Sequence, residues 1–207
     1  MKNRQAEIIK HMNPKELLYH LYLSQIAFFA IGLVLAYFLF NSFGSFKEIF
    51  AWQPVDIFVI GTVVALIVVG ADLLLMKRVP KSLLDDGGIN EKMFQTRSFP
   101  HIILLAFIIS FAEEFLFRGV LQTHFGIWVA SILFAVLHIR YLHKWVLFLS
   151  VVIISFILGY TYEVTGSLWV TIWAHFLIDM LLACKIRADY LKTKNKWKTG
   201  VVSDGEQ

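Results

Sequence analysis

Long apolar runs separated by short polar segments constrain this chain more than any other feature of its sequence. A helix needs about 20 apolar residues to cross the hydrocarbon core of a bilayer. Of the 207 residues, 58% are hydrophobic and 16% are charged, whereas a soluble domain carries about a quarter charged residues. So short a chain cannot bury this much apolar surface in one globule. The candidate spans are Leu21–Phe40, Val55–Met76, Phe99–Gln122, Phe125–His138, Trp145–Tyr160 and Leu168–Cys184.

These runs predict an all-α polytopic membrane protein with about six transmembrane helices. The first run is too long for the core of a signal peptide, and no small-x-small cleavage pattern follows it. We therefore interpret it as a retained helix. The expected location is a bacterial cell membrane, which the chain crosses several times. The single cysteine, Cys184, excludes an internal disulfide.

Lysine and arginine residues gather in every second loop, the pattern that keeps loops in the cytoplasm. They precede the first span and follow the second, fourth and sixth, so both termini are predicted to be cytoplasmic. The formal net charge of +4 reflects this topology signal, and nucleic acid is not expected as a partner. The basic residues are Lys2, Arg4, Lys10 and Lys15; Lys77, Arg78, Lys81, Lys92 and Arg97; Arg140 and Lys144; and Lys185, Arg187, Lys192, Lys194, Lys196 and Lys198.

Ionisable side chains inside the predicted spans are candidates for function, because each costs roughly 2.5–3.5 kcal/mol at the bilayer centre. Glu114 and Arg118 are four residues apart on one helix face and can form an ion pair. Glu113 is rotated about 100° from Glu114 and can face a different partner. His175 and Asp179 share a face in the same way, as do Phe134 and His138. The candidates are Glu113, Glu114, Arg118, His138, His175 and Asp179.

Helical rise places four of these groups at one level of the membrane. Measured from turns near His124 and Gly166, Glu113, His138, His175 and Asp179 lie roughly 13–21 Å deep, close to the middle of a core about 30 Å thick. Carboxylates and imidazoles can activate water as general base and acid. The same four groups could hold a divalent metal, of which Zn²⁺ is the expected one, although a metal-free mechanism stays open.

Each candidate also has a purely structural interpretation. The Glu114–Arg118 pair is expected to support the structure rather than take part in the chemistry. Glu113 could be a protonated acid that only packs, but the two histidines at the same depth favour a site. Asp72, in the second span, is expected to make an interior polar contact.

Three short motifs in this order resemble those of the CPBP family, also called CAAX amino-terminal protease or Abi. The run from Glu113 to Arg118 matches its EExxxR motif, and the run from Phe134 to His138 resembles FxxxH. The run from His175 to Asp179 resembles HxxxN, in which aspartate occurs as a variant. EExxxR alone is a weak signal, but the three together are specific. The resemblance covers about residues 99 to 184.

The resemblance implies an intramembrane endopeptidase that acts on a membrane-associated protein or peptide. It implies that Glu113 activates water with help from His138, and that His175 and Asp179 hold the oxyanion. Glu114, Arg118 and Phe134 would support the site. An ionised Asp179 cannot donate a hydrogen bond to an oxyanion, so it must be protonated, bind a metal or orient His175. Residues 1–98 then form an N-terminal segment with two spans, 99–185 the catalytic core, and 186–207 a basic cytoplasmic tail.

Two other functions compete with proteolysis. The main alternative is a catalytically idle protein of the same fold, which binds a peptide or confers bacteriocin immunity. A proton-coupled transporter also uses buried acids and histidines, but the chain lacks the interrupted helix pairs and internal repeats typical of transporters. The sequence does not indicate a particular substrate or an oligomeric state.

Overall fold

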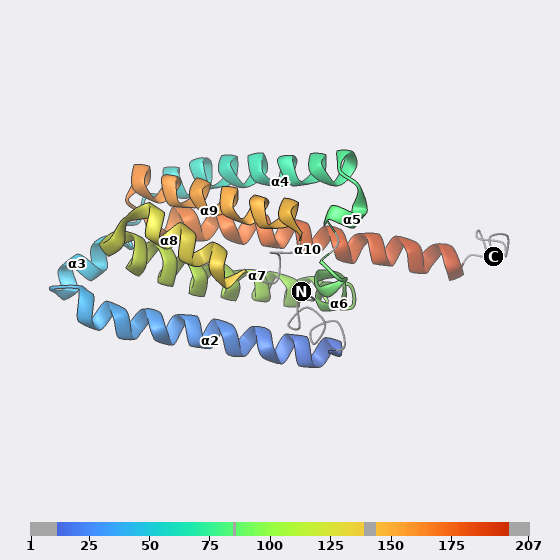
Figure 1. Cartoon of the computed structure of the whole chain (residues 1–207), viewed down its shortest axis with the longest axis horizontal. Helices are drawn as coiled ribbons and strands as arrows, with labels where there is room; N and C mark the ends of the chain where they lie inside the picture. The colour runs from blue at the N-terminus through green and yellow to red at the C-terminus, as the bar shows by residue number, and fades with distance from the viewer. Residues whose placement is uncertain (1–11, 85, 139–143, 199–207) are drawn as a thin grey trace.

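The computed structural model describes residues 12–84, 86–138 and 144–198, and every element in these ranges is helical. A bundle of long helices runs roughly along one axis, and short helices cap its two ends (Figure 1). The elements are α2 (Pro14–Leu39), α3 (Phe43–Glu48), η1 (Asp56–Ile60), α4 (Gly61–Arg78), α5 (Lys81–Leu84), α6 (Ile89–Phe94), α7 (Phe99–Glu114), η2 (Phe115–Gln122), α8 (Thr123–Leu137), α9 (Trp145–Thr165) and α10 (Leu168–Lys198).

Among the described residues, five helical stretches are long and apolar enough to cross a membrane, which confirms the predicted polytopic all-α class. Their outer faces carry large apolar side chains, such as Phe38 at 75% exposure and Leu66 at 57%. Exposed apolar surface of this extent is what lipid covers. The predicted third and fourth spans belong to one stretch, Phe99–Leu137.

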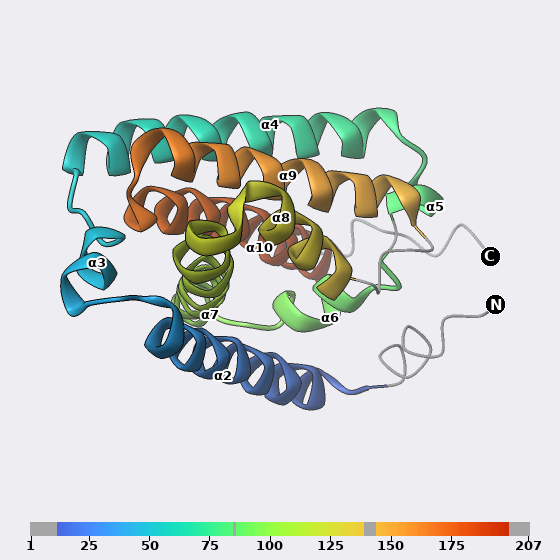
Figure 2. The same ribbon diagram turned by 60° about the vertical axis from the view of Figure 1, so that its left-hand side comes forward.

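Within that stretch the chain turns at Gly126, whose φ of 80° and ψ of 168° lie outside the helical region. Glycine adopts a positive φ without the steric cost that a Cβ imposes. After the turn, α8 packs back along η2 (Figures 1 and 2). Residues 127–137 rise only about 16 Å, against a hydrocarbon core of about 30 Å. The helix of the predicted fourth span is therefore too short to cross by itself and ends at Leu137 inside the bundle. The next helix, α9, nevertheless starts beside α5, at the end of the bundle where α2 begins (Figure 1).

Local sequence signals fix where the helices begin and end. The Asn13 side chain accepts hydrogen bonds from the backbone N–H groups of Lys15 and Glu16, and Glu16 reciprocates to Asn13, which makes a full capping box. Helix α9 ends at Gly166, which has a left-handed φ of 63°. Backbone polar groups at these two helix ends thus have partners within the fold.

Helix α10 lies against most of the bundle, because it packs on α7, α4, α9 and α6. Its first turn is fastened to the α3–η1 connection. There the Leu168 N–H donates to the Ile49 carbonyl at 2.8 Å, and the Ser167 hydroxyl donates to the Ala51 carbonyl at 2.7 Å. This attachment sets the height of α10, and hence of its histidine, relative to the other helices.

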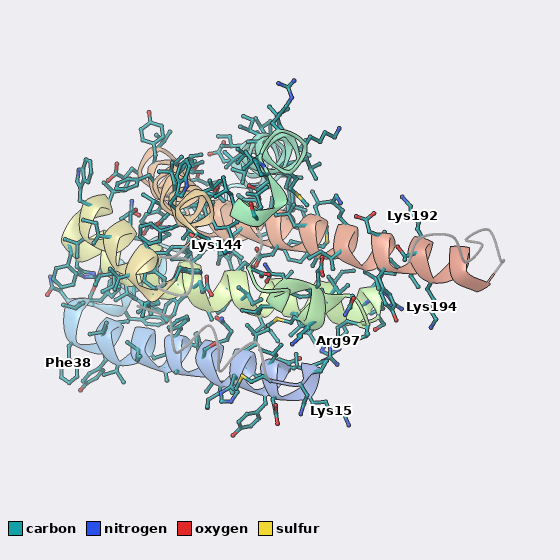
Figure 3. The ribbon with its side chains drawn as sticks, turned by 45° about the vertical axis from the view of Figure 1, so that its right-hand side comes forward. Lys15, Phe38, Arg97, Lys144, Lys192 and Lys194 are labelled. Carbon is teal, nitrogen blue, oxygen red and sulfur yellow. The ribbon has the colours of Figure 1, made fainter. Side chains whose placement is uncertain are left out.

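The two ends of the bundle differ in charge. Lys15, Arg97, Lys192 and Lys194 lie toward the end where α2 begins and α10 finishes, whereas Phe38 lies at the opposite end of α2 (Figures 1 and 3). The start of α2 and the finish of α10 are thus on one side, as the predicted topology requires. Of the basic residues in the predicted pattern, Lys2, Arg4, Lys10 and Arg140 lie outside the described residues.

The cytoplasmic location of this basic end is a prediction that fusion proteins can check. Alkaline phosphatase fused after Gln207 is expected to be inactive, because this enzyme needs the oxidising side of the membrane for its disulfides. The same enzyme inserted near Gly166 is expected to be active. Inverted activities would place the basic end outside and contradict the assigned orientation.

Candidate active site

A cavity of about 310 Å³ holds all four residues that the sequence predicts to be catalytic. It lies between six long helical segments and the short α6, so residues far apart in the sequence meet around it. Most of its walls are apolar, and its polar groups come from α4, α6, α7, α8, α9 and α10. Those polar lining residues are Asp72, Asn90, Glu113, His138, Ser150, His175 and Asp179.

At the centre of the bundle, Glu114 forms hydrogen bonds with both Arg118 and His175. It is fully buried, and Nε of Arg118 donates to its Oε2 at 3.3 Å. Its other oxygen, Oε1, lies 2.9 Å from Nδ1 of His175. The expected Glu114–Arg118 ion pair is therefore present, and it also orients a histidine of α10. Because the carboxylate accepts, Nδ1 of His175 is the donor in this contact.

Arg118 is the largest fully buried side chain among the described residues. Besides Glu114, its guanidinium donates to the hydroxyl oxygens of Ser155 at 2.9 Å and Ser131 at 3.5 Å. Its central carbon also lies 5.5 Å from the centre of the Phe134 ring, a cation–π distance. Arg118 thereby connects η2 to α8 and α9, which agrees with a supporting role.

His138 is held in one orientation by the turn of α8 that precedes it. Its Nδ1 lies 2.9 Å from the Phe134 carbonyl oxygen, and its ring stacks on the Phe134 ring with centroids 4.6 Å apart. A carbonyl oxygen can only accept, so Nδ1 carries the hydrogen. In the neutral ring, Nε2 is then the basic nitrogen. Phe134 thus lies between Arg118 and His138, and it supports both.

Glu113 points away from its neighbour Glu114, as the rotation between adjacent helical residues requires. Its side chain lines the cavity and is 7% exposed. The amide Nε2 of Gln25, on α2, donates to its Oε1 at 3.1 Å. The two adjacent carboxylates therefore accept different hydrogen bonds: Glu114 from Arg118 and His175, and Glu113 from the Gln25 amide.

Asp179 lies one turn beyond His175 on the cavity side of α10. Its Oδ2 is 3.6 Å from Nε2 of His175, within ion-pair range but longer than a normal hydrogen bond. The Asp179 side chain is 30% exposed, and that of His175 is 9% exposed. Both ring nitrogens of His175 thus face a carboxylate, so both can carry hydrogens.

The four residues were also predicted to be able to hold zinc. A metal site needs its donor atoms gathered within about 2.0–2.3 Å of one point. Among the described residues, no group of three His, Cys, Asp or Glu side chains is gathered in this way. The arrangement does not fit a zinc ion as it stands, and zinc stays a prediction of the sequence.

Several residues of the site escaped the sequence analysis, which followed ionisable groups. The uncharged ones are Gln25, Ser131 and Ser155, which are buried in apolar helices. A polar residue inside an apolar run was the sequence signal that could have identified them. Asp72, expected to make an interior polar contact, lines the cavity.

Comparison with known proteins places the same residues in a family. Residues 95–181 match the family model described as type II CAAX prenyl endopeptidase Rce1-like, a segment that includes Glu113, His138, His175 and Asp179. The chain is 54% identical, over 143 residues, to the Bacillus subtilis (strain 168) protein named Uncharacterized protein YpbD. The alignment covers 68% of this chain and 76% of that protein. No solved structure matches. The chain therefore belongs to the type II CAAX prenyl endopeptidase Rce1-like family.

Proposed function

We propose that this protein is an intramembrane endopeptidase, which hydrolyses a peptide bond of a membrane-associated protein or peptide with water activated by Glu113 and His138. The observation that supports it most is the contrast between the two adjacent glutamates. Glu114 is paired with the permanent cation Arg118, which favours its ionised form throughout. Glu113 instead lines the cavity and accepts a hydrogen bond from the Gln25 amide, so its carboxylate can meet a water molecule there. A general base must change its charge during each turnover.

The chemistry follows from the positions of the groups. The Glu113 carboxylate takes a proton from a water molecule in the cavity while the water oxygen bonds to the carbonyl carbon of the peptide. The carbon–nitrogen bond then breaks, and the proton passes from Glu113 to the leaving amine. The product pair is one carboxylic acid and one amine, so atoms and charges balance.

The two histidines act on either side of this step. With its hydrogen on Nδ1, His138 offers Nε2 to accept a hydrogen bond from the attacking water and orient it. Nε2 of His175 can carry a hydrogen and donate to the oxyanion that forms. Glu114 fixes the orientation of His175 through Nδ1. This is the arrangement in which a preorganised donor lowers the barrier most.

The cavity walls and the charge pattern suggest how a substrate reaches the site. The lining is mostly apolar and includes Leu21, Phe94 and Ile186 near the basic end of the bundle. An apolar peptide segment that enters from that side would lie against Glu113. The Bacillus relative supports a bacterial cell membrane as the location.

The direct test is cleavage of fluorogenic membrane peptides by the purified protein in lipid vesicles. Comparative membrane proteomics of cells with the wild type and with Glu113→Gln would identify the natural substrate as a protein processed only by the wild type. Tight peptide binding without cleavage would favour an idle binding or immunity protein. Proton-driven uptake by the same vesicles would favour a transporter.

Asp179→Asn separates a residue-only mechanism from a zinc-dependent one. The geometry favours the mechanism without zinc, so we expect the variant to keep at least a tenth of the wild-type turnover. Asparagine has the size of the carboxyl group, and its amide N–H can donate where a protonated Asp179 would. If the site uses zinc, loss of a supporting carboxylate costs about 10–100-fold in affinity or activity. The measurement pairs turnover with metal analysis of both proteins. Stoichiometric zinc in the wild type that disappears with the variant's activity would establish the zinc hypothesis instead.

A further inference from the structure

Gln25 contacts the predicted general base from a helix outside the family match. It lies on α2, whereas the match begins at residue 95. Its amide Nε2 is 3.1 Å from Oε1 of Glu113, across 88 residues of sequence. Gln25 is 3% exposed and is not among the residues that line the cavity. It therefore lies behind Glu113 and holds one carboxylate oxygen while Glu113 itself reaches the cavity.

Contacts on either side of Gln25 fix its height on Glu113. One turn before it, the Tyr22 hydroxyl lies 3.1 Å from Nε2 of His101 on α7. Two turns after it, Gly32 lies so close to η2 that an added Cβ would stand 2.8 Å from the Phe115 ring. Any larger residue would force the Phe115 ring or the helices to shift at that point. The register of α2 against α7 and η2 is thus set at two levels.

Gln25 also has a cost that a packing role does not explain. Its Oε1 is buried and accepts no hydrogen bond from any residue that the structure describes. A buried acceptor without a partner destabilises a fold, and an apolar side chain of the same shape would avoid that. The cost is explained if the N–H group of the Gln25 amide has a role that a methionine side chain could not fill, namely donation to Glu113.

We propose that Gln25 is a positioning residue for Glu113, which fixes the direction of the carboxylate so that one oxygen faces the water in the cavity. The inference rests on the proposed hydrolytic function, since it assigns Gln25 a part in the same step. The helix α2 is then part of the catalytic site rather than only a membrane anchor. A hydrogen bond to a charged group is strong enough to hold a side chain with several rotamers in one of them.

The test compares Gln25→Met with the wild type in the vesicle assay. Methionine keeps the length and volume of the side chain but has no donor. We expect kcat to fall roughly 10- to 100-fold, the size of a lost hydrogen bond to a charged group. KM should change less than threefold, because Gln25 does not line the cavity. An unchanged kcat, or a loss confined to KM, would overturn the proposal.

Gln122→Met is the matched control. Gln122 is also a buried glutamine, it donates to a backbone carbonyl, that of Gly159, at 2.7 Å, and its Oε1 likewise lacks a partner among the described residues. The Gln122 amide donates to Gly159 and not to Glu113. Its replacement should leave kcat of the folded protein within a factor of three of the wild type. An equal fall of kcat in both variants would show a general structural effect and refute the special role of Gln25.

A second measurement tests the hydrogen bond between Gln25 and Glu113 without an activity assay. Thermal unfolding of Gln25→Met, Glu113→Leu and the double variant should show shifts that do not add. Each single change leaves one buried polar group without its partner, whereas the double change removes both. The double variant should therefore unfold at a higher temperature than the sum of the two shifts predicts. Additive shifts would refute the pairing. If the wild type cleaves no peptide while the shifts are non-additive, the proposed function fails and the contact stands.

Discussion

Replacement of Glu113 by glutamine is expected to abolish peptide hydrolysis while the protein still inserts and folds. The amide has the shape of the carboxylate, so the contact with Gln25 can persist in a rearranged form, but it cannot take a proton from water. Removal of a positioned general base typically costs 10²- to 10⁴-fold in rate. The measurement is turnover of a membrane peptide in vesicles, with size-exclusion chromatography and a melting curve to show that the variant is folded.

Glu163→Gln makes the same chemical change at an exposed position near the end of α9, and it controls for the loss of one negative charge. It should retain wild-type turnover. Near-normal turnover by Glu113→Gln would remove Glu113 from the mechanism and leave the idle binding protein as the better explanation of the fold. A loss in both variants would point to an effect of net charge on insertion or assembly.

Arg118→Ala is expected to harm folding more than any other single change at this site. Arg118 is fully buried and bonds Glu114, Ser155 and Ser131. Its removal leaves the Glu114 carboxylate buried without its cation and opens a space beside Phe134. The loss of one member of a buried ion pair costs about 3–5 kcal/mol. A large fall in melting temperature and in yield should follow.

The double variant Arg118→Ala with Glu114→Gln tests the pairing itself. Because glutamine carries no charge that needs the missing cation, part of the lost stability should return. If the two shifts in melting temperature simply add, the residues do not act as a pair. Arg78→Ala, at an exposed position at the end of α4, is the control and should leave the melting temperature nearly unchanged.

The sequence by itself determined the class of fold and predicted the residues that meet around the cavity, for a local reason. Runs of about 20 apolar residues must cross a bilayer as helices, and i, i+4 spacing must place two side chains on one face. Glu114 with Arg118, His175 with Asp179, and Phe134 with His138 are all pairs of this kind, and each is in contact in the structure. The charges that a membrane helix tolerates only at a cost marked helices that line the cavity.

The tertiary structure decided which side chains of different helices meet. Such contacts depend on the register of one helix against another and not on the spacing of residues within one helix. Gln25 meets Glu113 across 88 residues, and His175 meets Glu114 across 61. Neither pairing follows from hydropathy, since a slide of α2 or α10 by one turn would bring other residues together. The predicted fourth span also reads as an apolar run, yet the turn at Gly126 makes it a short helix that ends inside the bundle. Only that geometry brings His138 to the cavity that Glu113 also lines.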